Sequence, residues 1–317
     1  MIRLGLCCIF RDEPIKFRTT TATFVQKLTR VEGLARISSL CLENARSLMA
    51  ALQFCDRNGI GCFRINSQIL PLKTHPVAGY LIEELPDHEE IVRAFKACGD
   101  FARRHRLRTC FHPDQFVVLN SRKPEVVASS LRELEYQAEV AEWVGADVIN
   151  IHAGGAFGDK TQSLLDFARS VESLSDRARS RLTIENDDKV YAPADLLPLC
   201  RALQLPLVYD VHHHRCHPDG LSVEEATADA LTTWSREPLF HLSSPIDGWS
   251  GVKPQRHHDF IDVNDFPVCW LPLDLTVEVE AKAKEVAVAR LKNELDTTLR
   301  LAMIRRDGGS NVSPSLS

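Results

Sequence analysis

Histidine and acidic residues follow a series of short apolar runs along the chain. The runs end in or carry His112, His152, Glu185, Asp210, His241, Glu278 and Glu280, and the segments after them add His75, His213, His257 and His258. Imidazole and carboxylate groups together suit zinc, manganese or iron. Buried carboxylates that lie close together repel one another and need cations between them. The pattern therefore predicts a site for more than one metal ion, an arrangement typical of in-line displacement at phosphorus.

The stretch YDVHHH, from Tyr209 to His214, is the densest part of this pattern. It ends an apolar run that begins at Leu205, and a further histidine, His217, follows it. A solvated loop and chance are alternatives to a metal site for such a run. An affinity tag does not fit well, because the run is internal and holds only three consecutive histidines.

Eight β-rich runs, most of them separated by helical patterns, must position these residues. We expect strands at 2–8, 59–66, 107–113, 146–154, 181–187, 205–213, 239–244 and 273–281, and helices at 40–58, 87–106, 124–145, 162–179, 194–204, 222–235 and about 281–304. This alternation predicts a parallel sheet, and eight units favour a closed (β/α)8 TIM barrel. A doubly wound open sheet is the alternative, but no G-x-G-x-x-G motif follows the first run. In a barrel, the active site lies at the carboxyl ends of the strands, where the histidines and acids fall.

Composition limits the remaining classes of protein. The 317 residues are 44% hydrophobic and 26% charged, with a net charge of −5, so a global electrostatic attraction to nucleic acid is not implied. Local basic stretches at 16–18 and 103–108 fit a DNA-facing surface or a solvated face. No apolar run is long enough to span a membrane, and the start of the chain does not resemble a secretory signal. Ten scattered cysteines without a C-x-x-C pair favour a reduced, cytoplasmic protein. We expect one catalytic domain at 1–304 and a disordered tail at 305–317.

The chain resembles the UV damage endonucleases, DNA-repair enzymes whose barrels are like those of endonuclease IV and xylose isomerase. The resemblance runs from Arg3 to about Leu291. The stretches that carry it are RLG (3–5), FRI with ILPLKTHP (63–76), HPDQF (112–116), IHAGGAFGDK (151–160), IEND (184–187), DVHHH (210–214), HLSS (241–244) and EAKAKE (280–285). It implies an endonuclease that nicks a DNA strand immediately 5′ to UV photoproducts and some other lesions, and that uses up to three manganese ions.

The resemblance also implies roles for individual residues. The implied metal ligands are His75, His112, His152, Glu185, Asp210, His213, His241, His257 or His258, and Glu280. Among them, we expect Glu185, His241 and Glu280 to be catalytic. Gln115 resembles a glutamine that probes the lesion, and Phe116 would enter the base stack beside it, where damage has already weakened stacking. His212 and His214 match no ligand of the family.

Three features depart from the family pattern. A lysine that is carboxylated to bind metal commonly precedes the strand-seven histidine by two residues, and here that position is Leu239. A tyrosine and an asparagine after the first strand are replaced by Leu6 and Phe10, which we expect at the DNA surface, and another tyrosine is replaced by Phe116. Arg64, near the end of the second strand, faces either DNA or the barrel.

The predicted function is attack of metal-activated water on a DNA phosphodiester. The predicted partner is double-stranded DNA carrying lesions, and no membrane or obligate protein partner is expected. One alternative is a sugar isomerase or epimerase of the same barrel superfamily, although the histidine-rich ligand set and HPDQF disfavour it. The other is a protein that binds lesions without cutting, which the departures at Leu239, Leu6 and Phe10 keep open.

Overall fold

The computed structural model describes the backbone of residues 1–308 and the side chains of residues 1–297. Eight parallel strands form one sheet in the order β6-β5-β4-β3-β2-β1-β8-β7. The strands are β1 (Ile2–Cys7), β2 (Cys62–Ile65), β3 (Arg108–Phe111), β4 (Val148–His152), β5 (Leu182–Glu185), β6 (Leu207–Val208), β7 (Leu239–Leu242) and β8 (Leu275–Val279). Each lies within the run predicted for it, and the predicted TIM barrel is confirmed.

The two edge strands of the sheet, β6 and β7, meet at a short seam. A parallel bridge pairs Asp210 with His241, and the His241 N–H donates to the Tyr209 carbonyl at 3.0 Å. Strand β6 is short because Asp210 begins a helix: its side chain accepts a hydrogen bond from the N–H of His213 and caps α8 (Val211–Cys216). The predicted strand at 205–213 is therefore wrong beyond Val208, and the YDVHHH stretch turns from strand into helix.

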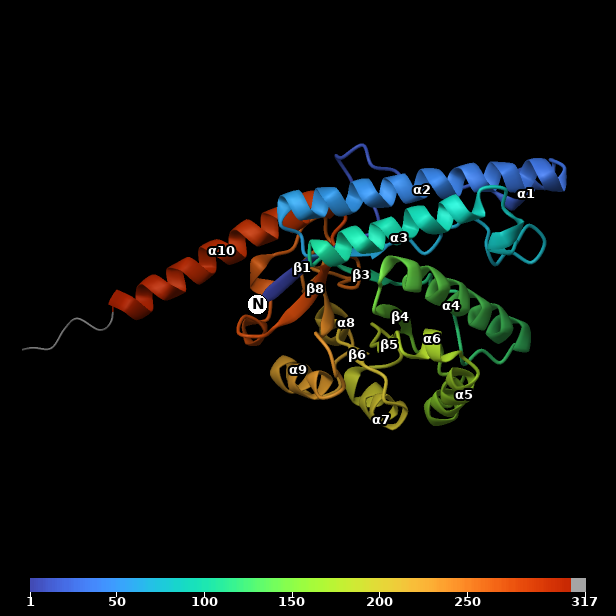
Figure 1. The fold of residues 1–317 in the computed structure, drawn as a ribbon. Coiled ribbons are helices and arrows are strands. Elements are labelled where there is room, and N and C mark those ends of the chain that lie inside the picture. The colour runs from blue at the N-terminus through green and yellow to red at the C-terminus, as the bar shows by residue number, and fades with distance from the viewer. Residues whose placement is uncertain (309–317) are drawn as a thin grey trace, which may run out of the picture.

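Helices cover the outside of the barrel (Figure 1). They are α1 (Ala22–Val25), α2 (Arg30–Asn58), α3 (His88–Arg104), α4 (Pro124–Val144), α5 (Lys160–Glu172), α6 (Asp176–Arg179), α7 (Pro193–Leu203), α8, α9 (Val223–Leu231) and α10 (Lys284–Gly308), with 3-10 turns at Ile82–Glu84, Val263–Asp265 and Val268–Trp270. Helix α2 starts at Arg30 rather than at the predicted residue 40, because Thr29 and Glu32 form a capping box there. Figure 1 shows α2 and α3 side by side along one flank.

The last helix packs beside the first strand and the end of α2, where Lys292 Nζ donates to the Asn58 carbonyl at 3.1 Å. It includes residues 305–308, the start of the predicted tail, and residues 309–317 lie outside the described part of the chain. Within the described residues, no helix combines the length and apolarity needed to cross a bilayer.

The interior of the barrel changes from apolar to charged along its axis. Its lower layer is a cluster of Cys62, Cys110, Val148, Val208 and Leu239. The next inward positions along the same strands carry polar groups, and these alternate with outward side chains such as Phe63, which joins the core under the helices. The site at the mouth is therefore supported from below by a closely packed apolar layer.

Candidate metal centre

Glu185, at the end of β5, lies at the centre of the polar residues in the barrel mouth. Its side chain is 1% exposed. Oε2 lies 3.0 Å from His112 Nε2 and 3.9 Å from His152 Nε2, while Oε1 lies 3.1 Å from His241 Nδ1 and 3.3 Å from His213 Nδ1. One carboxylate thus faces a different pair of imidazoles with each of its oxygens.

Three overlapping triads of candidate ligands surround this carboxylate. They are His112, His152 and Glu185; His112, His241 and Glu280; and Glu185, Asp210 and His213. Within each triad the candidate ligand atoms lie within 4.8 Å of one another. Glu185 belongs to two of the triads, and a carboxylate can bind a different ion with each oxygen, so the geometry suits neighbouring divalent ions that share this residue.

Several atoms of this centre are buried and have no hydrogen-bond partner among the described residues. They are His152 Nδ1, Glu185 Oε1, Asp210 Oδ2 and His241 Nδ1. Leaving a buried polar group unpaired costs free energy, so a cluster of such atoms needs an explanation. Nitrogen and carboxylate oxygen atoms with free lone pairs are what a divalent cation requires, and the residues therefore fit metal ions.

The pKa values of the acidic and histidine residues also indicate a site that favours positive charge. Burial acts to raise the pKa of Glu185, but His241, His152 and hydrogen bonds from other imidazoles hold it well below its usual range. Burial acts to lower the pKa of His241, but the charge of Glu185, with that of Glu280, raises it to about 10. Asp210 and Glu185 likewise raise the pKa of His213 against the effect of burial. The carboxylates of the centre thus favour positive charge beside them, which metal ions would supply.

Two asparagines that the sequence did not predict for the site support its acidic residues, one through a carboxylate and the other through the backbone. Asn150 Nδ2 donates to Glu185 Oε2 at 2.5 Å, and Thr183 Oγ1 donates to Asn150 Oδ1 at 3.0 Å. Asn186 Nδ2 donates to the Asp210 carbonyl at 2.9 Å, and Asn186 Oδ1 accepts from the Asp210 N–H at 2.9 Å. The alternation of β4 places Asn150 on the same face as His152, which is the signal that would have identified it.

The adjacent histidines after β7 differ in orientation. His257 Nδ1 lies 3.9 Å from Glu280 Oε2, and its ring lies near those of His212 and His213. His258 Nδ1 instead accepts from the Phe260 N–H at 2.9 Å, and its ring faces Phe260. Of the two alternatives, the geometry favours His257 as the candidate ligand and places His258 in the loop packing.

His75 lies outside the triads formed by the described residues. Its Nδ1 accepts from the N–H groups of Val77 at 3.1 Å and Ala78 at 3.0 Å. It lines a cavity of about 350 Å³ together with Lys73, Phe116 and other residues of the loops after β2 and β3. Its role as a ligand remains a prediction.

The predicted DNA contacts fall into two groups. Gln115 and Phe116 are exposed in the loop after β3, and 77% of Phe116 is accessible to solvent. Leu6, however, is fully buried, and Phe10 packs its ring on Phe54 and Phe63 at centroid distances of 5.2 and 5.9 Å. The prediction that Leu6 lies at a DNA surface is therefore wrong, because this side chain is part of the core beneath the helices. Phe10 is partly buried against the same core, and its contact with DNA stays a prediction.

Arg64 faces the barrel interior rather than DNA. It is 7% exposed, and it pairs with Glu280 Oε1 at 2.7 Å and with Glu278. The basic stretch at 103–108 also lies away from the mouth, since it joins α3 to the amino end of β3. Leu239 is fully buried in the lower apolar layer and presents no ligand atom.

The fold and the site define a barrel enzyme with a candidate polynuclear metal centre at its mouth. A family model described as UV-endonuclease UvdE matches residues 2–309. The chain is 34% identical to a UV DNA damage endonuclease of Deinococcus radiodurans, over 92% of this chain and 94% of the relative. It is 33% identical to one of Bacillus velezensis, over 91% of each.

Two solved structures resemble this chain. The crystal structure of SacUVDE superposes with a TM-score of 0.83 at 28% identity, over 94% of this chain and 99% of the other. Endonuclease IV from Thermus thermophilus superposes with a TM-score of 0.59 at 15% identity, over 94% and 99%, and this second likeness concerns the fold alone. The chain belongs to the UV-endonuclease UvdE family and is an endonuclease.

Proposed function

We propose that the chain is a manganese-dependent repair enzyme that nicks DNA immediately 5′ to UV photoproducts and other lesions. The observation that carries the proposal is the set of three triads joined by Glu185 and His112, in a chain of the UV-endonuclease family. A candidate centre with room for more than one ion suits displacement at a phosphodiester.

The candidate ligands for two or three manganese ions are the members of the three triads. His257 lies beside them, and His75 is a more distant candidate. When bound, the ions would supply the Lewis acidity that activates water and neutralises charge on the phosphate. Glu185, His241 and Glu280 would define the catalytic geometry: Glu185 orients its two oxygens toward different imidazoles, and Arg64 holds Oε1 of Glu280.

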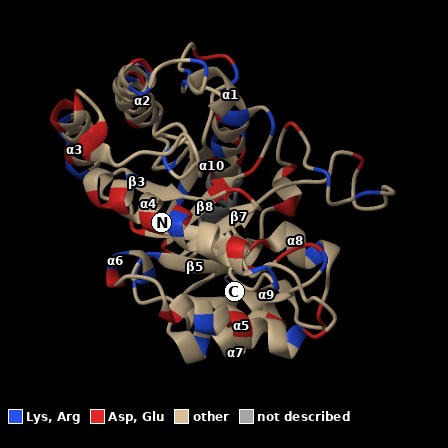
Figure 2. Ribbon diagram, turned by 90° about the vertical axis from the view of Figure 1, so that its right-hand side faces the viewer, with Lys and Arg blue, Asp and Glu red and all other residues tan. Residues whose placement is uncertain are grey.

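DNA would approach the carboxyl ends of the strands. Exposed basic side chains occupy loops on this face, among them Lys16 and Arg18 after β1, Arg122 after β3, and Lys253 and Arg256 after β7. Figure 2 shows basic and acidic segments interspersed over the surface in view, so the attraction to phosphate is local and not a property of the net charge. Gln115 and Phe116 would then enter the damaged stack.

A nicking assay tests the proposal. A duplex with one cyclobutane dimer, labelled at its 5′ end, should yield a single product ending 5′ to the dimer when Mn²⁺ is added, and none in EDTA. Glu185→Gln and His112→Ala should reduce nicking to background. Undamaged duplex is the control for specificity.

The same assay separates the alternative functions. Lesion binding without a nick under any divalent metal would instead support a protein that recognises damage without cutting. Isomerisation of a ketose, without nicking, would support a sugar isomerase. Either result would overturn the proposed activity.

A further inference from the structure

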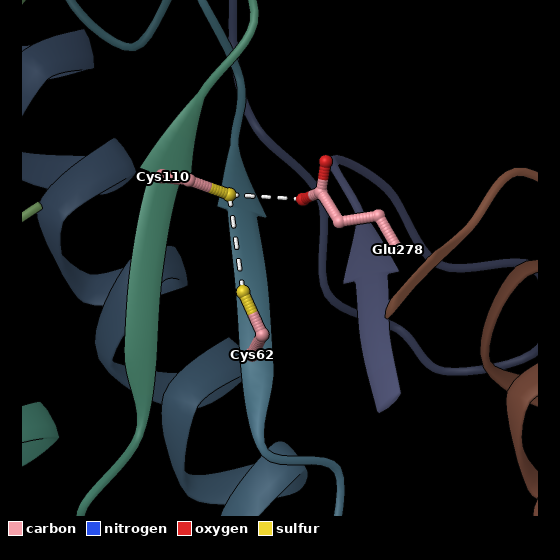
Figure 3. Close-up of side chains that lie close together, drawn as sticks. All are labelled: Cys62, Cys110 and Glu278. Carbon is pink, nitrogen blue, oxygen red and sulfur yellow. Dashed lines mark hydrogen bonds between the residues drawn. The ribbon is translucent and has the colours of Figure 1, made fainter. Parts of the chain in front are cut away.

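Glu278 lies on β8, two residues before Glu280, and its side chain is buried inside the barrel. Its side chain is 1% exposed, and it contacts side chains of strands β2, β3 and β7. Figure 3 shows it opposite Cys110 of β3, with Cys62 of β2 beside that thiol. Cys110 Sγ lies 2.9 Å from Glu278 Oε1 and 3.8 Å from Cys62 Sγ.

These three side chains are close enough to hold an ion, but their charges do not favour one. Arg64 Nε donates to Glu278 Oε2 at 2.8 Å, and a second guanidinium nitrogen also contacts that oxygen. A cation placed here would be repelled by the guanidinium at short range. A thiolate 2.9 Å from the carboxylate would be repelled by it, whereas a thiol donates a hydrogen bond. Cys110 and Arg64 therefore anchor Glu278 through hydrogen bonds.

His241 connects this anchor to the candidate metal centre. Its ring is fully buried, and its Nε2 lies 2.9 Å from Glu278 Oε2 and 3.0 Å from Arg64 Nη2. Arg64 Nη2 can only donate to Nε2, whereas Glu278 Oε2 can accept from an Nε2–H, so these two neighbours favour opposite tautomers of the ring. The opposite ring nitrogen, Nδ1, lies 3.1 Å from Glu185 Oε1 and 3.5 Å from Glu280 Oε1.

We propose that Glu278 is a positioning residue: when Nδ1 of His241 binds metal, Glu278 accepts a hydrogen bond from the Nε2–H that the neutral ring keeps, and so fixes the ring with Nδ1 toward the metal centre. Cys110 and Arg64 fix the orientation of the Glu278 carboxylate, and Glu278 in turn fixes the imidazole. A carboxylate behind a ligand histidine orients the ring and strengthens it as a donor. The inference rests on the proposed function, since it takes His241 as a metal ligand.

Substitution of Glu278 tests the proposal through metal binding as well as activity. Glu278→Leu keeps the volume but removes the acceptor, and it should weaken Co²⁺ and Mn²⁺ binding by about tenfold and change the visible Co²⁺ absorption spectrum. Glu278→Gln keeps an oxygen acceptor, and it should restore the spectrum and bind within about threefold of the unsubstituted protein. Calorimetric titration of the full chain measures the affinities.

The two cysteines provide a matched pair of controls. Both thiols lie in the same apolar layer, but the thiol that donates to Glu278 is that of Cys110. Cys110→Ala should weaken metal binding by about threefold, and Cys110→Ser, which keeps a donor, should recover it. Cys62→Ala should leave the affinity and the Co²⁺ spectrum unchanged.

The outcomes separate this inference from the proposed function. If the unsubstituted protein binds metal but does not nick DNA, the proposed function fails, and the spectra still decide the role of Glu278. An unchanged Co²⁺ spectrum and affinity in Glu278→Leu would overturn the inference, as would equal losses in Cys62→Ala and Cys110→Ala. If Glu278→Leu does not fold, as judged by circular dichroism, the cysteine pair decides.

Discussion

His257 and His258 show how far neighbouring residues of one type can differ. The ring of His257 faces Glu280, whereas the ring of His258 accepts a backbone hydrogen bond from Phe260. The sequence left both open as ligands, because the short motif around them allows either alignment. Only the path of the loop, which pairs Pro245 with His257 and ties the His258 N–H to the Ser244 carbonyl, separates them.

His257→Gln and His258→Gln should therefore have different effects. Loss of the His257 imidazole should weaken Mn²⁺ binding and nicking, whereas loss of the His258 imidazole should lower thermal stability slightly and leave metal affinity unchanged. Calorimetry and thermal unfolding measure the two quantities. Weaker metal binding in His258→Gln than in His257→Gln would show that the assignment is reversed.

Phe116 is a second residue whose environment points to function. Because 77% of this large side chain is exposed, it contributes little to the free energy of unfolding, and its removal should destabilise the protein only slightly. Phe116→Ala should weaken binding to a dimer-containing duplex by about tenfold, since an aromatic ring stacks on unpaired bases. Leu165→Ala, at a 52% exposed apolar residue on α5, is the control. Equal binding by Phe116→Ala and the unsubstituted chain would contradict the role in the stack.

At the scale of elements, the pattern of apolar runs located all eight strands, because parallel strands buried on both faces are nearly continuous in hydrophobicity. Strand ends also predicted most of the mouth, including His112, His152, Glu185 and His241. The pattern could not show that Leu6 and Phe10 turn toward the helices, since their burial depends on packing with distant residues such as Phe54 and Phe63. The pattern did not predict α8 either, because a helix of 6 residues is too short to show helical periodicity.

Asp210 has two separable roles in this short helix. Oδ1 caps α8 by accepting from the His213 N–H at 2.8 Å, and Oδ2 is free to bind metal. Asp210→Asn should keep the cap but lose metal affinity, because asparagine caps helices as well as aspartate does. Asp210→Ala should lose both, and in EDTA it should be about 1 kcal/mol less stable than Asp210→Asn in urea unfolding. Equal stabilities of the two variants would show that the cap contributes nothing.

At the scale of the whole molecule, the amino end of the barrel is held by a network remote from the mouth. Arg3 Nε of β1 donates to Glu237 Oε1 at 2.8 Å, and Thr276 Oγ1 of β8 donates to the same oxygen at 2.6 Å. Burial acts to raise the pKa of Glu237, but the hydrogen bonds from Arg3 and Thr276 lower it below its usual value. This carboxylate thus joins the first and last strands through the segment before β7.

The pH dependence of stability follows from the direction of that shift. A carboxylate whose pKa is lower in the folded than in the unfolded chain stabilises the fold above the unfolded value of about 4.3, and the stabilisation is lost as the pH falls through the folded pKa. Glu237→Gln should therefore reduce the urea midpoint more at pH 7 than at pH 3. The exposed Glu172→Gln on α5 is the control. A reduction that is equal at both pH values would contradict the assigned cause.

The seam between β6 and β7 has a mechanical consequence. The backbone joins these edges through one bridge, and the candidate ligands stand on both sides of it: Asp210 and His213 on one, His241 and Glu280 on the other. Ions bound across this line would add a second link between the two edges, so the seam would open less often with ions bound than without them. Hydrogen exchange at the His241 amide should accordingly slow when Mn²⁺ is added, and an unchanged rate would show that the seam is closed by the chain alone.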